Sequence, residues 1–133
     1  MKFATLEDIN VVAQYLYSMY MEVDPEDTKD NFDLFLNLAT GYIIKDFVIV
    51  DNRGFFIMKD ETPIVKKTKI WNGVAVYIKP EFRKGKTLKE FYTFMFTNFK
   101  GTIMGYTEVN SEHNKVLLKR HKLMGYVYEM YRS

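Results

Sequence analysis

The 133-residue chain contains no cysteine and only three prolines and seven glycines. The absence of cysteine excludes disulfides, thiolate metal sites and a cysteine nucleophile, and it fits a reducing compartment. No linker rich in glycine, proline and serine interrupts the sequence, and no internal repeat occurs. We therefore expect a single domain over residues 1–133.

Strong charge and long apolar runs are also lacking. Nineteen basic and seventeen acidic residues leave a net charge of +2, far below the excess expected of a protein that binds nucleic-acid backbones. No run approaches the ~18 apolar residues of a membrane span, and the start MKFATLEDIN has no signal-like apolar core. We expect a cytoplasmic protein without a nucleic-acid or membrane partner, in which any anion site is local.

Aromatic residues, in contrast, are abundant. The chain is 47% hydrophobic and 17% aromatic, with eleven phenylalanines and ten tyrosines. Large aromatic side chains are mostly buried, so this composition favours a bulky core over a base-stacking surface. A small domain with this many rings can have more apolar surface than one core covers, which predicts a homodimer.

The hydrophobic periodicity predicts an alternation of strands and helices. A strand, a crossover helix and a second strand normally form a parallel pair, whereas two runs joined by Asp51-Asn52-Arg53-Gly54 predict an antiparallel hairpin. The fold class is therefore α/β (α+β), with a mixed, mostly antiparallel sheet, one parallel pair and about four flanking helices. In chain order, strands are expected at 2–4, 43–50, 55–59, 70–79, 102–109 and 126–131, and helices after Thr5, from 32 to a cap at Gly41, from 87 to 99 and at 111–122.

The stretch PEFRKGKT, residues 80–87, ends like a nucleotide-binding P-loop. The leading glycine of that motif is Pro80 here, which fixes φ and removes one backbone amide. Thr87 has another role available, because with Glu90 it predicts a capping box for the following helix. A P-loop ATPase would also need a mostly parallel sheet and a metal-binding carboxylate, for which Glu108 is the only candidate. The loop is suited to phosphate, and ATP is the less favoured ligand.

Two segments, together with the order of elements, resemble the GNAT superfamily of acetyl-CoA-dependent N-acetyltransferases. The first is VYIKPEFRKG at 76–85, similar to the family's strand and pyrophosphate loop. The second is NKVLLKRHKLMGY at 114–126, similar to its late helix. Counted from Arg83, the family's two small loop positions are Lys86 and Leu88; counted from Phe82, they are Gly85 and Thr87.

The resemblance implies a GNAT-like fold over nearly the whole chain, acetyl-CoA as co-substrate and an amine acceptor of a small molecule or protein. Loop amides and a helix N-terminus suit a diphosphate. An alternative is a catalytically inactive GNAT-like binding protein, favoured by the atypical loop. The cofactor-binding candidates are Tyr77, Ile78, Arg83, Lys84, Gly85, Lys86, Thr87, Leu88 and Asn114.

Catalytic candidates follow from the chemistry of acetyl transfer. An acetyl carbonyl lying along a strand can accept a backbone N–H, for which Tyr77 and Ile78 are candidates. Glu81 and Glu108 could take the proton of the amine through water. His121 stands where the family carries a tyrosine, and it either protonates the leaving thiolate or is one more residue of a basic helix face. His113 and His121 lie eight apart with no third ligand, so we expect no metal.

Overall fold

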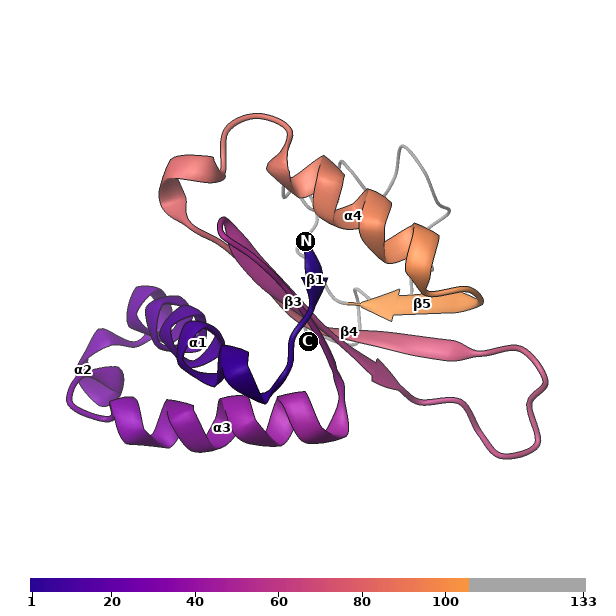
Figure 1. Ribbon diagram of the computed structural model, residues 1–133, viewed down its shortest axis with the longest axis horizontal. Coiled ribbons are helices and arrows are strands. Elements are labelled where there is room, and N and C mark those ends of the chain that lie inside the picture. The colour runs from indigo at the N-terminus through magenta and orange to yellow at the C-terminus, as the bar shows by residue number, and fades with distance from the viewer. Residues whose placement is uncertain (106–133) are drawn as a thin grey trace, which may run out of the picture.

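The computed structural model describes residues 1–105, which form one sheet with helices on both faces (Figure 1). The strands are β1 (Lys2–Phe3), β2 (Phe47–Asp51), β3 (Gly54–Asp60), β4 (Ile70–Ile78) and β5 (Thr102–Gly105). The α-helices are α1 (Ile9–Val23), α2 (Pro25–Thr28), α3 (Phe32–Lys45) and α4 (Thr87–Asn98), with 3-10 turns at Leu6–Asp8 and Pro80–Phe82.

The sheet has the order β1-β2-β3-β4-β5. The first three pairs are antiparallel and β4 pairs with β5 in parallel, which confirms the predicted mixed sheet. The helix expected at 111–122 and the strand expected at 126–131 lie outside the described residues. Within residues 1–105, no helix is long and apolar enough to cross a membrane.

Alternating side chains of the central strands fill a different core on each face of the sheet. Phe55 and Ile57 of β3 point toward α1 and α3, whereas Phe56 and Met58 pack with Phe91 of α4. All five of these side chains are at most 1% exposed. Many of the aromatic side chains therefore lie in these two cores. The sheet between the cores fixes where β4 and α4 meet.

Local signals at two turns are confirmed. The carboxylate of Asp8 accepts the backbone N–H of Thr5 at 2.8 Å, which caps the turn that leads into α1. Asp51-Asn52-Arg53-Gly54 forms the β2–β3 hairpin, and Asp51 pairs directly with Gly54. These signals involve residues at most three apart, so neighbouring side chains decide them.

Two other boundaries were predicted wrongly. Helix α3 does not end at Gly41 but continues to Lys45, because Tyr42 and Ile43 pack against the core and outweigh the weak helix propensity of glycine. The strand expected from Ile43 therefore begins only at Phe47.

The capping box expected of Thr87 and Glu90 is also absent. Thr87 is the first residue of α4, so the N-cap position falls on Lys86. No side-chain hydrogen bond caps the helix there. Thr87 is buried instead, and the Glu90 carboxylate accepts a hydrogen bond from Arg53. The N-terminus of α4 therefore lacks a side-chain cap.

Candidate active site

The candidate site lies at the C-terminal end of β4, where the chain turns into α4 (Figure 1). Strand β4 carries one extra residue: Gly73 pairs with Met58 and Ala75 with Ile57, so Val74 has no partner on β3. Such a bulge bends a strand and changes which edge its backbone groups face. Within residues 1–105, β5 pairs in parallel with Ile70–Gly73, the part of β4 that precedes the bulge.

The N–H groups of Tyr77 and Ile78, the two candidates for holding the acetyl carbonyl, face opposite edges of β4. The N–H of Lys79 donates to the carbonyl oxygen of Arg53 at 2.8 Å, so the N–H of Tyr77 also faces β3. The N–H of Ile78 therefore faces the opposite edge, on the side of β5. Of the two donors expected from the sequence, the geometry favours Ile78.

The segment Pro80–Lys86, called here the β4–α4 loop, presents a run of free backbone donors. No acceptor within the described chain bonds the N–H groups of residues 84–89. Gly85 has φ +121°, and a Cβ placed on it would meet nothing within 4 Å. Successive free amides leading into a helix N-terminus form a concave anion site. The loop thus has the donors that a diphosphate requires.

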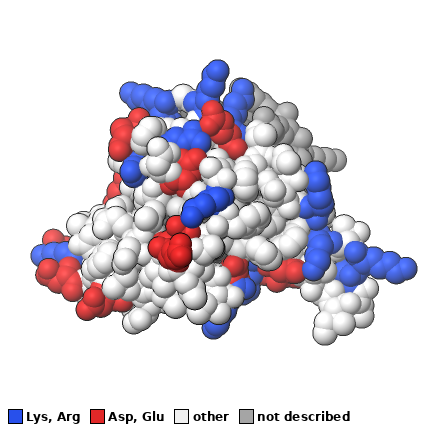
Figure 2. Space-filling model, viewed as in Figure 1, with Lys and Arg blue, Asp and Glu red and all other residues white. Residues whose placement is uncertain are grey.

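Of the three basic side chains of the loop, one is hydrogen-bonded within the protein and two have no ion-pair partner among the described residues. Arg83 donates through Nε to the carbonyl oxygen of Ile78 at 2.7 Å and through its terminal nitrogen to both oxygens of Glu22 at 2.7 Å. Hydrogen bonding by Glu22 raises the pKa of the Arg83 guanidinium above its usual value. Lys84 and Lys86 are exposed, without ion-pair partners in the described part of the chain. Figure 2 shows basic side chains gathered over this loop, at the top of the view.

The two residues that replace small ones in the family pattern do not fill the loop. Leu88 is partly buried against the core on the α4 side of the sheet, together with Phe91. Lys86 is exposed. The Leu88 side chain therefore has a packing role on the α4 side of the sheet.

A charged network fixes the first turn of α4 to the β2–β3 hairpin. The Asp51 carboxylate accepts two bonds from the guanidinium of Arg53, at 2.9 and 3.0 Å, and Arg53 also pairs with Glu90 of α4. The N-terminal amine of Met1 lies 3.6 Å from Asp51. The hydroxyl of Tyr15 donates to the Asp51 carbonyl oxygen at 2.7 Å. Through the Arg53–Glu90 pair, these contacts fix the first turn of α4, which follows the β4–α4 loop.

Because this network contains the ionised Asp51 carboxylate, the stability of the fold depends on pH. Arg53 lowers the pKa of the Asp51 carboxyl from 3.8 to about 2. Because the folded-state pKa is the lower one, the ionised form stabilises the fold above pH 3.8, and that contribution is lost as pH falls toward 2. We expect Asp51→Asn to lower the free energy of unfolding by about 2 kcal/mol at neutral pH, with a difference from wild type that shrinks below pH ~4.

Urea unfolding at a series of pH values measures this difference. The matched control is Asp33→Asn in the exposed first turn of α3, which we expect to cost about 0.5 kcal/mol or less. A difference for Asp51→Asn that stays constant from neutral pH to pH 2 would contradict the role of this carboxylate.

Of the remaining site residues expected from the sequence, only Glu81 lies within the described part of the chain. Glu81 is exposed, within the 3-10 turn that opens the β4–α4 loop. Glu108, Asn114 and His121 lie outside the described residues. In the described range, no three His, Cys, Asp or Glu side chains come together as metal ligands.

Several contacts at the site were not predicted from the sequence. The Glu22–Arg83 pair joins residues 61 apart, and Arg53 and Glu90 are 37 apart. The bulge at Val74 shows only when β4 is aligned against β3. The local signals that pointed to the site were the basic composition of the loop and the PEFRKGKT and VYIKPEFRKG segments.

Several solved structures have a fold similar to that of this chain. A possible acetyltransferase from Clostridium difficile 630 superposes with a TM-score of 0.68 at 13% identity, covering 92% of this chain and 90% of that one. A ribosomal-protein-alanine N-acetyltransferase from Brucella melitensis biovar Abortus 2308 gives 0.67 at 15% identity, covering 91% and 89%. A GCN5-related N-acetyltransferase from Ralstonia eutropha JMP134 gives 0.57 at 10% identity, covering 92% of each.

This chain has the GNAT fold. The predicted resemblance is thereby confirmed at the level of the fold, and the coverage extends over nearly the full length of each neighbour. No protein-family model matches the sequence, and no curated protein matches it. The mostly antiparallel sheet also differs from the parallel sheet that an ATP-type P-loop requires.

Proposed function

We propose that this GNAT-fold chain is an N-acetyltransferase that moves the acetyl group of acetyl-CoA to an amine of a small molecule or protein. The observation that carries the proposal is the run of unbonded amides at residues 84–89, at the N-terminus of α4. The names of the structural neighbours support the same reaction class.

The described residues fit the diphosphate of the co-substrate. The amides of the β4–α4 loop and the positive end of α4 would hold its charge, and Lys84 and Lys86 add free cations. The left-handed backbone of Gly85 lets the loop approach a phosphate without an intervening side chain. Arg83 acts differently, because its bonds to Glu22 and Ile78 tie the loop to α1.

The chemistry needs three further roles. The thioester supplies an electrophilic carbonyl, which an N–H such as that of Ile78 can hold and polarise. Glu81 is exposed at the start of the loop, and in this proposal it accepts the proton of the amine through water. Glu108 as a second base, Asn114 as a contact to the cofactor arm and His121 as the acid for the thiolate are part of the proposal through the family resemblance.

A second candidate is a GNAT-fold binding protein without catalytic activity. The engagement of Arg83 by Glu22 favours it, since one loop cation is already neutralised. Thiol release from acetyl-CoA, measured with a panel of amine-bearing small molecules and peptides, separates the two. We expect amine-dependent release for the enzyme; coenzyme binding without release from any amine would favour the binding protein.

The proposal includes a cytoplasmic location and self-association. Exposed aliphatic side chains on α1 and α3, such as Val23 (80% exposed) and Ile44 (66%), are surfaces that a second copy could cover. Light scattering tests the homodimer: a mass near the 15.8 kDa of one chain at high concentration would contradict it.

A further inference from the structure

The loop between β3 and β4 projects from the body of the molecule, at the end of β4 opposite the candidate site (Figure 1). Its tip is a tight turn from Pro63 to Lys66, closed by a 3.0 Å bond from the Lys66 N–H to the Pro63 carbonyl oxygen. The two central residues are Ile64, 103% exposed, and Val65, 90% exposed. Most exposed apolar residues are scattered singly, but here two adjacent aliphatics occupy a convex tip.

The base of this loop is well bonded. Lys69 pairs with Asp60 at 2.8 Å, and the Thr62 hydroxyl accepts the Ile70 N–H at 2.8 Å. The N–H of Thr62 donates to Asp60 at 3.0 Å. The tip is therefore held out by its own hydrogen bonds, and its exposure follows from this geometry.

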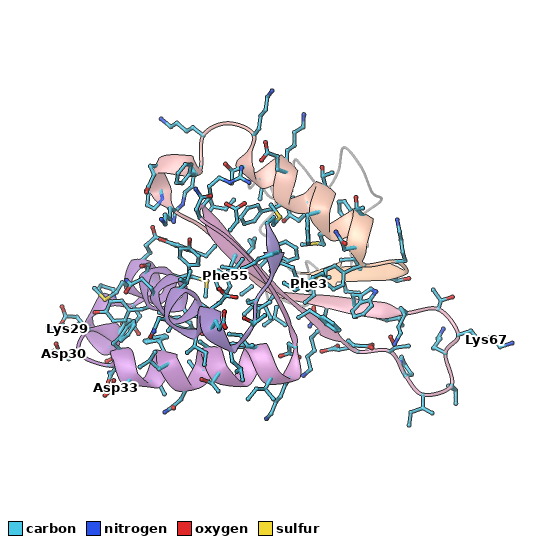
Figure 3. All side chains as sticks on the ribbon, in the orientation of Figure 1. Phe3, Lys29, Asp30, Asp33, Phe55 and Lys67 are labelled. Carbon is cyan, nitrogen blue, oxygen red and sulfur yellow. The ribbon has the colours of Figure 1, made fainter. Side chains whose placement is uncertain are left out.

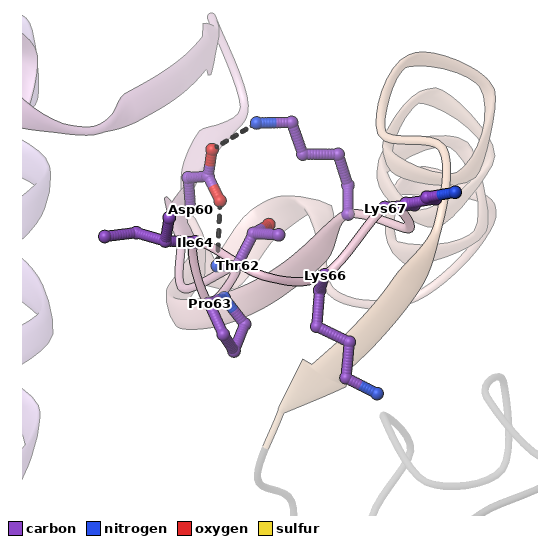
Figure 4. Close-up of a pocket in the computed structure, with 7 residues that line it drawn as sticks. Asp60, Thr62, Pro63, Ile64, Lys66 and Lys67 are labelled. Atoms are coloured by element: carbon purple, nitrogen blue, oxygen red, sulfur yellow. Dashed lines mark hydrogen bonds and ion pairs between the residues drawn. The ribbon is translucent and has the colours of Figure 1, made fainter.

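Free cations flank the apolar tip. Lys66 and Lys67 have no ion-pair partner among residues 1–105, and both point away from Asp60 (Figure 4). With Lys69 they border an open hollow of about 400 Å³. Figure 3 shows Lys67 at the far end of the loop, and Figure 2 shows basic side chains beside an uncharged protrusion there.

We propose that this tip is a contact site for an anionic lipid surface. The tip presents two exposed aliphatics beside two free lysines, and this combination matches the boundary between acyl chains and charged headgroups. Ile64 and Val65 insert, and Lys66 and Lys67 meet lipid phosphates in the hollow. Such contact is peripheral and needs no membrane-spanning helix, and it departs from the expectation of no membrane partner drawn from the sequence.

The site is independent of acetyl transfer. Nine residues of β4 separate the loop from the candidate active site, and at ~3.3 Å per strand residue that distance is about 30 Å. A protein docked by the tip would therefore hold its β4–α4 loop away from the lipid. Vesicle binding is expected with or without acetyl-CoA.

Co-sedimentation of the full chain with vesicles tests the proposal. We expect binding to phosphatidylcholine mixed with phosphatidylglycerol and at least about fivefold weaker binding to phosphatidylcholine alone, since each lysine near an anionic surface contributes about fivefold. Val65→Ser should weaken binding about tenfold, because a buried aliphatic contributes at least that much. Lys66→Gln with Lys67→Gln should remove the preference for the anionic lipid.

Matched controls separate the tip from general charge and apolarity. Val23→Ser removes a similarly exposed valine on α1, and Lys84→Gln with Lys86→Gln removes two lysines at the other end of β4. Both should bind vesicles like wild type. Equal binding by the tip variants and wild type, no binding of wild type to anionic vesicles, or tip-dependent capture of an acidic protein without vesicle binding would overturn the proposal.

Discussion

Gly85→Val is expected to weaken acetyl-CoA binding at least about tenfold. A β-branched residue at φ +121° is strained by about 1–3 kcal/mol, so the loop must change its path. The new side chain would also stand among the free amides of residues 84–89, where the diphosphate is proposed to bind. Isothermal titration with acetyl-CoA measures the loss.

Two comparisons make this result specific. Gly41→Val places the same side chain on α3, where an added Cβ meets nothing and φ is not positive, and should leave affinity unchanged. Lys84→Gln should weaken binding about fivefold or less, as expected for one exposed charge. Equal affinities for Gly85→Val and wild type would mean that this loop does not hold the diphosphate.

Gly54→Ala is expected to destabilise the fold by about 3 kcal/mol or more. A Cβ on Gly54 would lie 2.0 Å from the carbonyl oxygen of Tyr77 and 2.9 Å from Cα of Ile78. Both are backbone atoms in the ladder, so β3 and β4 must separate, and overpacking of this kind costs roughly 1–3 kcal/mol or more. Urea unfolding followed by circular dichroism measures the change.

Gly73→Ala provides the control within the same pair of strands. Its added Cβ would lie 3.5 Å from the Met104 carbonyl oxygen, which is an ordinary contact, so the cost should stay below about 1 kcal/mol. Equal destabilisation by the two alanines would indicate a general cost of losing glycine from the sheet. It would contradict the close approach of Gly54 to β4.

Local patterns in the sequence were sufficient for much of the fold. The Thr5–Asp8 cap, the β2–β3 hairpin and β4 were all predicted, because each depends on neighbouring residues or on a periodicity of two. The end of α3 was not, since tertiary packing carries the helix past Gly41.

The candidate site was less accessible to sequence reasoning. The composition of residues 83–87 indicates an anion loop, but only the fold shows that Arg83 is bonded to Glu22 and that the N–H of Ile78 faces away from β3. Contacts between residues 61 apart leave no periodic trace in the sequence. The exposure of Ile64 and Val65 could not be predicted either, because an apolar pair in a sequence does not reveal whether a core lies beside it.

A competition titration tests whether the β4–α4 loop binds the diphosphate of acetyl-CoA. Wild-type protein is titrated with acetyl-CoA at low and high salt, first alone and then with either Mg-ATP or coenzyme A present. We predict saturable binding that weakens as salt screens Lys84 and Lys86, and competition by Mg-ATP that is no stronger than competition by coenzyme A. No heat of binding at millimolar acetyl-CoA, or tight binding of Mg-ATP in its place, would contradict the account.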